Sequence, residues 1–260
     1  MEKDERIVIS ASRRTDLVSC YPDALLERLR AFEPKTIHTI VLWTKNPRNL
    51  LTQSPLRSRL LQYRQLYLHL TITGMGGGAF EPAIPPWKEV IGMVEPLIEL
   101  TGSPQRISWR FDPIIEVQRG AEAYTNWEKF PLIAEALRPW GIRDCRVSWV
   151  SPYPKVIRRL GKHGWSLRVL DPEERKAKAE ELIRMAQKLS FHLHFCAQED
   201  LPLSRCIDGS KLQELHPDRS ACSERKDRKQ RPLCGCSESV DIGSYALRCR
   251  NGCLYCYALP

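Results

Sequence analysis

The sequence has no long hydrophobic run and no apolar leader. Its 260 residues never approach the roughly 18 consecutive apolar residues that a membrane helix needs. The first ten residues, MEKDERIVIS, are charged and then strand-like, which is not the pattern of a signal peptide. These absences predict a cytoplasmic protein with no membrane-spanning segment.

Cysteine is nearly absent from the first 190 residues, where only Cys20 and Cys145 occur. A chain of this length can bury a core without disulfides, and without a secretion signal its thiols are expected to be reduced. The distribution therefore predicts metal or redox chemistry in the C-terminal quarter. The cysteines there are Cys196, Cys206, Cys222, Cys234, Cys236, Cys249, Cys253 and Cys256.

Acidic residues are scarcer than basic ones. Thirty-one Asp and Glu stand against forty Lys and Arg, which leaves a formal net charge of +9. This excess favours an anionic partner such as nucleic acid, a phosphate or a carboxylate substrate, although proteins without such partners also carry it.

The chain has no internal repeat, and short β-branched apolar runs alternate with helical segments. This pattern is typical of a parallel sheet. Strands are expected at 7–12, 38–44, 67–73, 106–111, 145–150 and 192–197, and helices at 22–32, 86–100, 125–140 and 171–190. The predicted fold class is α/β: a partial (β/α)6 TIM-like barrel over residues 1–200, with an irregular cysteine-rich tail, 201–260, packed on the barrel mouth.

Charged residues follow four of the expected strands. Barrels of this kind place their chemistry at the C-terminal ends of the strands. Arginine and lysine there can bind a carboxylate or phosphate, and acidic residues can orient them or handle protons. The alternative is that these charges are simply solvated. The candidate catalytic residues are Arg13, Arg14, Asp16, Lys45, Arg110, Asp112 and Glu199.

The glycine-rich stretch TGMGGG, at 73–78, fits neither the P-loop nor the dinucleotide-binding pattern. It is expected to be a flexible loop. The alternative is that backbone N–H groups at Gly76 and Gly77 contact a cofactor or an anion.

The last segment, CRNGCLYCYALP, spaces Cys249, Cys253 and Cys256 four and three residues apart. Thiolates this close can converge on one centre, as they do around iron–sulfur clusters. A structural zinc ion normally takes four ligands, for which Cys236 is available as the fourth. Free thiols are the third possibility.

This C-x3-C-x2-C spacing, with Tyr255 before the last cysteine, resembles the signature of radical S-adenosylmethionine enzymes, most of all the spore photoproduct lyase branch. The resemblance implies a [4Fe–4S] cluster on the three cysteines, with S-adenosylmethionine on the fourth iron and Tyr255 beside them. It also implies a reductant such as flavodoxin or ferredoxin. In that superfamily the motif follows the first strand of a partial (β/α)6 barrel. Here it follows the last, which implies a circularly permuted arrangement.

Seven segments in order resemble the family called domain of unknown function 1848. They are SASRRTD, LWTKNP, WRFDP, CAQEDL, RCIDG, CGCSESVDIGSY and GCLYCYA. This resemblance implies no particular reaction or substrate for the chain. Members of the family continue beyond the last Cys-Tyr-Ala, so the resemblance implies that this chain is truncated after Pro260.

The same segments contain Cys196, Cys206, Cys234 and Cys236, which makes a second metal site of four thiolates a hypothesis. Cys222 can replace any of them. The alternative for Cys196 is a small buried apolar residue on a strand.

The leading function is thus a radical S-adenosylmethionine-like iron–sulfur enzyme acting on a small-molecule or nucleic-acid-derived anion. Two other classes stay open. One is a non-catalytic, metal-stabilised nucleic-acid-binding protein, and the other is a zinc protein whose barrel does other chemistry.

Overall fold

The computed structural model describes residues 6–199 and 201–259. Its centre is a parallel sheet whose first six strands along the chain are those expected from the sequence. They are β1 (Ile7–Ala11), β2 (Ile37–Thr44), β3 (Leu66–Thr71), β4 (Ile107–Ile114), β7 (Asp144–Trp149) and β9 (His192–Phe195). A seventh strand that the sequence did not indicate, β10 (Val240–Asp241), pairs in parallel with β1.

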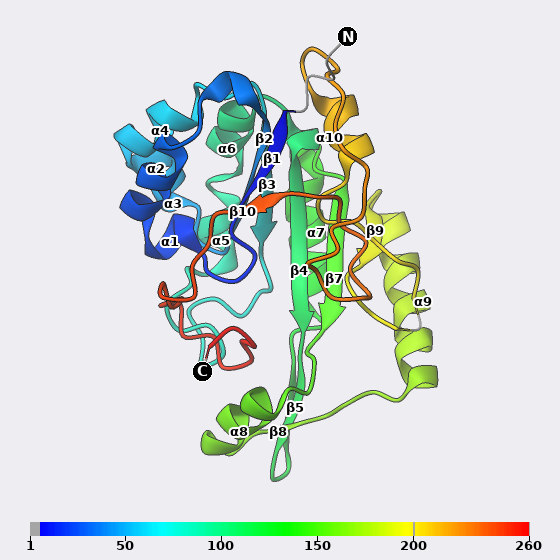
Figure 1. Cartoon of the computed structure of the whole chain (residues 1–260). Coiled ribbons are helices and arrows are strands. Elements are labelled where there is room, and N and C mark those ends of the chain that lie inside the picture. The colour runs from blue at the N-terminus through cyan, green and yellow to red at the C-terminus, as the bar shows by residue number, and fades with distance from the viewer. Residues whose placement is uncertain (1–5, 200, 260) are drawn as a thin grey trace.

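The strand order is β10-β1-β2-β3-β4-β7-β9 (Figure 1). Over the residues that the structure describes, β9 and β10 are the two edges and do not pair with each other. The α/β prediction is therefore confirmed, and the sheet is open rather than closed into a barrel.

Helices occupy the crossovers between the strands. They are α1 (Leu17–Cys20), α2 (Pro22–Arg30), α3 (Arg48–Thr52), α4 (Ser54–Leu60), α5 (Trp87–Ile91), α6 (Val94–Thr101), α7 (Lys129–Leu137) and α9 (Pro172–Lys188). The helix expected at 86–100 is two helices, α5 and α6, which are separated at Gly92 and Met93. The helix α9 begins with a capping box, in which Asp171 and Glu174 satisfy each other's backbone N–H groups.

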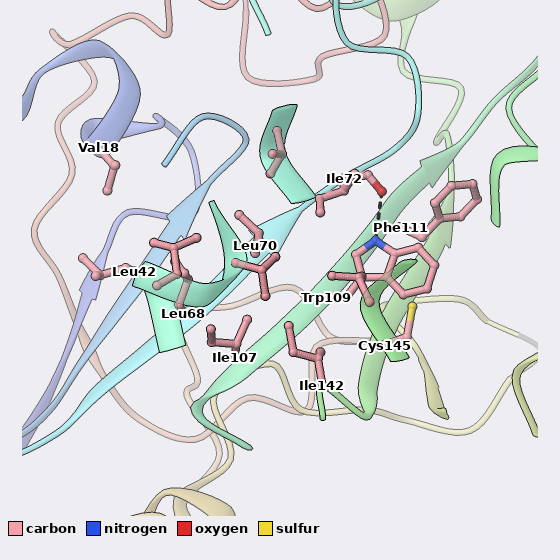
Figure 2. Close-up of a cluster of buried hydrophobic side chains, with 14 of the residues drawn as sticks. Val18, Leu42, Leu68, Leu70, Ile72, Ile107, Trp109, Phe111, Ile142 and Cys145 are labelled. Atoms are coloured by element: carbon pink, nitrogen blue, oxygen red, sulfur yellow. Dashed lines mark hydrogen bonds between the residues drawn. The ribbon is translucent and has the colours of Figure 1, made fainter. Parts of the chain in front are cut away.

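The main hydrophobic core lies between the sheet and these helices. Figure 2 shows part of it, including Leu68, Leu70 and Trp109 from neighbouring strands. The indole N–H of Trp109 donates to the carbonyl of Ile72 at 2.9 Å, so this large ring is buried without an unpaired polar atom.

Residues of the C-terminal tail cover the other side of the strands. Val8, Val41 and Tyr67 share a buried cluster with Ile207 and Leu212 from the tail helix α10 (Gly209–Leu215) and the segment before it. Because both sides are covered, the strands read as nearly continuous hydrophobic runs.

Polar side chains on the strands and directly before them also bind this tail. The buried Arg146 on β7 donates to the carbonyl of Arg205 at 2.9 Å, and Gln65 donates to the carbonyl of Leu212 at 2.8 Å. These bonds fix the tail along the sheet.

A small antiparallel sheet extends beyond the C-terminal ends of β4 and β7 (Figure 1). It contains β5 (Glu116–Arg119), β6 (Glu122–Thr125) and β8 (Ser166–Leu167), and the helix α8 (Pro154–Lys162) lies beside it. The sequence did not predict this part, because its strands are short and mostly polar.

Among the described residues, none of the helices combines the length and the apolar character needed to cross a membrane.

Candidate functional site

A cavity of about 460 Å³ lies at the C-terminal ends of the parallel strands. The tail forms part of its wall, so residues far apart in the sequence meet there. All seven cysteines that the sequence singled out as metal ligands line it: Cys196, Cys206, Cys234, Cys236, Cys249, Cys253 and Cys256. Cys20, Cys145 and Cys222 lie outside this wall. The two expected cysteine groups therefore share one cavity.

The closing motif is held by the glycine-rich loop that follows β3. The N–H of Leu254 donates to the carbonyl of Phe80 at 3.0 Å, and the hydroxyl of Tyr255 bonds to the buried carboxylate of Glu81. Gly76 and Gly77 lie outside the cavity wall. A Cβ at Gly76 would lie only 2.1 Å from the carbonyl oxygen of Pro85, so glycine there permits close packing of the loop.

The helix α8 holds the same motif from the other side. Arg159 donates to the carbonyls of Leu254, Cys256 and Leu259 at 3.3, 2.7 and 3.1 Å. Val156 and Leu160 from this helix share a buried cluster with Cys253. The small sheet and α8 thus brace the closing motif.

The three sulfurs of the motif have different surroundings. Burial raises the pKa of Cys253 to about 12. The sulfur of Cys249 lies 3.9 Å from that of Cys20, at the end of α1, and this contact lowers the pKa of Cys249 to about 6. Over residues 6–199 and 201–259, no three or more His, Cys, Asp or Glu side chains are grouped so that they could hold a metal ion. The cysteines line a wall without converging on one point.

In the second group, the sulfurs of Cys196 and Cys206 are 3.8 Å apart. Arg110 donates to the sulfur of Cys206 at 3.2 Å, and the N–H of Ile207 donates to the sulfur of Cys236 at 3.4 Å. The contact with Cys196 is the main cause that lowers the pKa of Cys206, and the nearby guanidinium of Arg110 acts in the same direction. In this group, N–H donors therefore point at buried cysteine sulfurs, an arrangement that favours the thiolate form.

Two of the candidate cations flank Trp43 at the end of β2. The guanidinium of Arg13 lies 5.7 Å from the ring centroid and that of Arg110 lies 5.1 Å from it. Arg110 also pairs with Asp112, which in turn accepts from the hydroxyl of Ser148. These groups place positive charge on the cavity wall.

The two remaining candidate cations, Lys45 and Arg14, differ in their interaction partners. Lys45 donates to Glu81 at 2.8 Å and so carries a partner for its charge. Arg14 is exposed, and its guanidinium lies 4.3 Å from the ring centroid of Tyr245.

Asp16 lines the cavity and is also hydrogen-bonded to several parts of the fold. One of its oxygens accepts from the N–H of Ser19 at 2.8 Å and caps α1, and the other accepts from Thr44, from the N–H of Lys45 and from Asn251. Burial raises its pKa, while these hydrogen bonds act in the opposite direction. The carboxyl joins β1, β2 and the tail, which leaves little of it for proton transfer.

Glu199 does not reach the site. It is exposed and lies outside the cavity wall, whereas the neighbouring Gln198 lines it. The sequence interpretation extended β9 by too many residues, since the strand ends at Phe195.

Sequence reasoning missed several wall residues. Trp149 ends β7 and Tyr153 precedes α8, while Lys229, Arg231 and Tyr257 come from the tail. Trp149 had a usable signal, because it lies near the end of an expected strand, as Arg110 does. The tail residues had none, since only the fold brings a polar loop over the strand ends.

No curated protein matches the sequence. Solved structures with weak similarity to this chain include the carboxyl transferase domain of Rhizobium etli pyruvate carboxylase, with 3-bromopyruvate or with 3-hydroxypyruvate. The identity is 12% in both cases, with TM-scores of 0.30 and 0.29. Each match covers 95% of this chain but only 41% or 42% of the other, and similarity this weak supports no argument about fold or function. The family model called domain of unknown function (DUF1848) matches residues 31–258, so the chain belongs to that family.

Proposed function

We propose that this chain is a cytoplasmic iron–sulfur enzyme that resembles radical S-adenosylmethionine proteins and acts on an anionic substrate. One observation carries the proposal: the three cysteines of the closing motif and the cationic strand ends line the same cavity. Cys249, Cys253 and Cys256 would hold a [4Fe–4S] cluster, with Tyr255 beside it. When bound, the cluster and S-adenosylmethionine would supply abstraction of a hydrogen atom.

The sheet order supports the permuted arrangement. β10 is the edge strand next to β1, and the closing motif follows β10 along the chain. In space, the motif therefore follows the first strand of a parallel series that continues through β1, β2, β3, β4 and β7. This is the position that the radical S-adenosylmethionine resemblance implies, reached from the other end of the sequence.

The residues fit a cluster in their type and position. Three thiols from one short loop face a common cavity, and thiolates are the usual ligands of iron–sulfur clusters. Since the sulfurs do not converge in this structure, binding would require the closing motif to rearrange. The hydrogen bonds from Arg159 to Cys256 and from Leu254 to Phe80 would keep the rest of the tail in place during this rearrangement.

The protein's own groups would bind and orient the substrate. Arg13 and Arg110 would attract its negative charge, and Asp112 holds the guanidinium of Arg110 in place. The tail covers the strand ends, and this cover would keep water from the reacting groups. A reductant such as flavodoxin or ferredoxin would complete the system, and Cys196, Cys206, Cys234 and Cys236 remain a hypothesis for a second metal.

The test is metal analysis of protein purified or reconstituted without oxygen. We expect about four irons per chain for one cluster, and a broad charge-transfer absorption that Cys253→Ala removes. The matched control is Cys222→Ser, which changes a cysteine outside the cavity wall and should leave iron and absorption unchanged.

Two other results would contradict the proposal. Colourless protein with stoichiometric zinc on these cysteines would favour a zinc protein. Salt-dependent binding of DNA or RNA with no cofactor turnover would favour the metal-stabilised nucleic-acid-binding protein.

A further inference from the structure

Three buried donors on the cavity wall have no hydrogen-bond partner in the protein. They are Nε and Nη1 of Arg13 and Nε1 of Trp149, a residue that is only 8% exposed. The other unpartnered buried atoms among the described residues belong to side chains outside this wall. A donor that loses water on burial without gaining an acceptor is unfavourable, and native proteins keep few of them. The wall is thus complementary to acceptor atoms.

Arg13 differs from Lys45 and Arg110 in having buried side-chain donors without an acceptor. Lys45 is bonded to Glu81, and Arg110 is bonded to Asp112 and Cys206. Arg13 donates through Nη2 to Ser239 at 3.2 Å and forms an ion pair with Asp227, but its Nη1 lies 4.0 Å from the carboxylate oxygen, beyond hydrogen-bond distance. A fixed guanidinium with two free donor atoms is suited to a carboxylate or a phosphate.

Trp149 offers a different donor on another part of the wall. Its ring is stacked on Phe195, with centroids 5.9 Å apart and an interplanar angle of 5°, so the direction of its N–H is fixed. One neutral donor suits a carbonyl, a hydroxyl or a ring nitrogen.

The two donor groups are well separated in the sheet. β1, which precedes Arg13, and β7, which ends at Trp149, are separated by β2, β3 and β4. Four strand spacings of about 4.8 Å give about 19 Å between these two strands in a flat sheet, and less in a curved one. Trp43 and Arg110 line the wall between them.

We infer that the cavity binds an extended organic anion, with its carboxylate or phosphate on Arg13 and an uncharged acceptor on Trp149. The ligand passes the ring of Trp43 and the guanidinium of Arg110. The inference rests on the proposed function for the ligand's role as substrate, but binding itself requires neither the cluster nor turnover.

Calorimetric titration tests it with two kinds of probe. The short probes are acetate and inorganic phosphate. The extended probes are uridine 5′-monophosphate and linear ω-hydroxycarboxylates of four to nine carbons, which carry one anionic end and one uncharged acceptor. We expect at least one extended probe to bind about tenfold tighter than both short ones, because it fills both donor sites.

The variants separate the two ends of the ligand. Arg13→Gln should weaken every probe by at least about tenfold, since it removes a charged donor. Trp149→Phe keeps the ring but loses the N–H, and should weaken the extended probes about fivefold while leaving acetate and phosphate unchanged. Arg30→Gln and Trp140→Phe, outside the cavity wall, are the matched controls and should have no effect.

Clear outcomes overturn the inference. Extended probes that bind no tighter than acetate and phosphate would do so, as would unchanged binding in Trp149→Phe. If Arg13→Gln does not fold, Arg13→Lys takes its place, because lysine keeps the charge but has fewer donors. Unchanged binding in Arg13→Lys would also overturn the inference. Titrations run with and without bound iron keep the two proposals apart, because loss of the cluster alone leaves this binding intact.

Discussion

Replacing Arg159 with alanine should free the closing motif from α8. One half-buried guanidinium donates to three carbonyls of that motif, at 2.7 to 3.3 Å. Hydrogen bonds from a charged donor contribute about 1.5–3 kcal/mol. Because the carbonyls regain water when the loop opens, we take about 2 kcal/mol for the whole set, which corresponds to an opening equilibrium about 30-fold larger.

Hydrogen exchange measured by mass spectrometry over residues 250–259 provides the assay. Arg159→Ala should lose about 30-fold of its protection in this segment and none in β2 or β3. The matched control is the neighbouring Arg158→Ala, because Arg158 is exposed on the same helix. Protection in 250–259 that is equal in the two variants would refute the reasoning, and would mean that the Phe80 contact and the apolar cluster alone hold the motif.

Three further predictions concern the cluster, acid stability and the glycine loop. Adding S-adenosylmethionine to reduced, cluster-loaded protein should change its electron paramagnetic resonance spectrum and release 5′-deoxyadenosine. An unchanged spectrum would indicate that a fourth protein ligand occupies the cluster. Cys20 is the first candidate for that ligand, because its sulfur contacts that of Cys249. Burial lowers the pKa of His216 to about 4, so its stabilising effect is complete above the unfolded value near 6.5 and is lost as the pH falls toward 4. The free energy of unfolding, measured with denaturant, should therefore change less steeply with pH in His216→Asn than in the wild type over this window. The difference in slope corresponds to at most one bound proton, and an unchanged slope would contradict the prediction. Gly76→Ala should destabilise the protein by about 1–3 kcal/mol and so lower its thermal midpoint, because the added Cβ meets a carbonyl oxygen. Gly161→Ala in α8 has free space around the added Cβ and should raise the midpoint; equal midpoints in the two variants would show that the loop adjusts without loss of stability.

The sequence predicted the sheet well because its strands are buried on both sides. Runs such as HTIVLWT, which became β2, contain no polar face that could be confused with a loop. The small sheet from β5 to β8 lacked this signal, since strands such as EAYT are short and largely exposed. β10 is only two residues long, and nothing but its pairing with β1 defines it.

The candidate site was predictable where chemistry follows a strand. Arg13, Arg110 and Asp112 reached the cavity because strand ends meet at one edge of a parallel sheet. Asp16 also follows a strand and lines the cavity, but its carboxyl accepts four hydrogen bonds whose donors could not be inferred from the sequence. The contact between Cys20 and Cys249, 229 positions apart, could not be inferred from spacing.

The pairing of β10 with β1 has a consequence for the timing of folding. Residues 7–11 lie in the sheet edge that residues 240 and 241 complete, and the hydrogen bond from Ser10 to Asp241 spans 231 positions. At about 5–20 residues per second, a ribosome needs roughly 12–46 s to make the intervening chain. During that interval β1 can pair with β2 but keeps an open edge, and none of the wall that Cys249, Cys253 and Cys256 supply exists. The cavity therefore cannot be completed before residues 249–256 have been made, so a metal centre in it would have to be loaded after translation of the closing motif rather than during translation of the sheet.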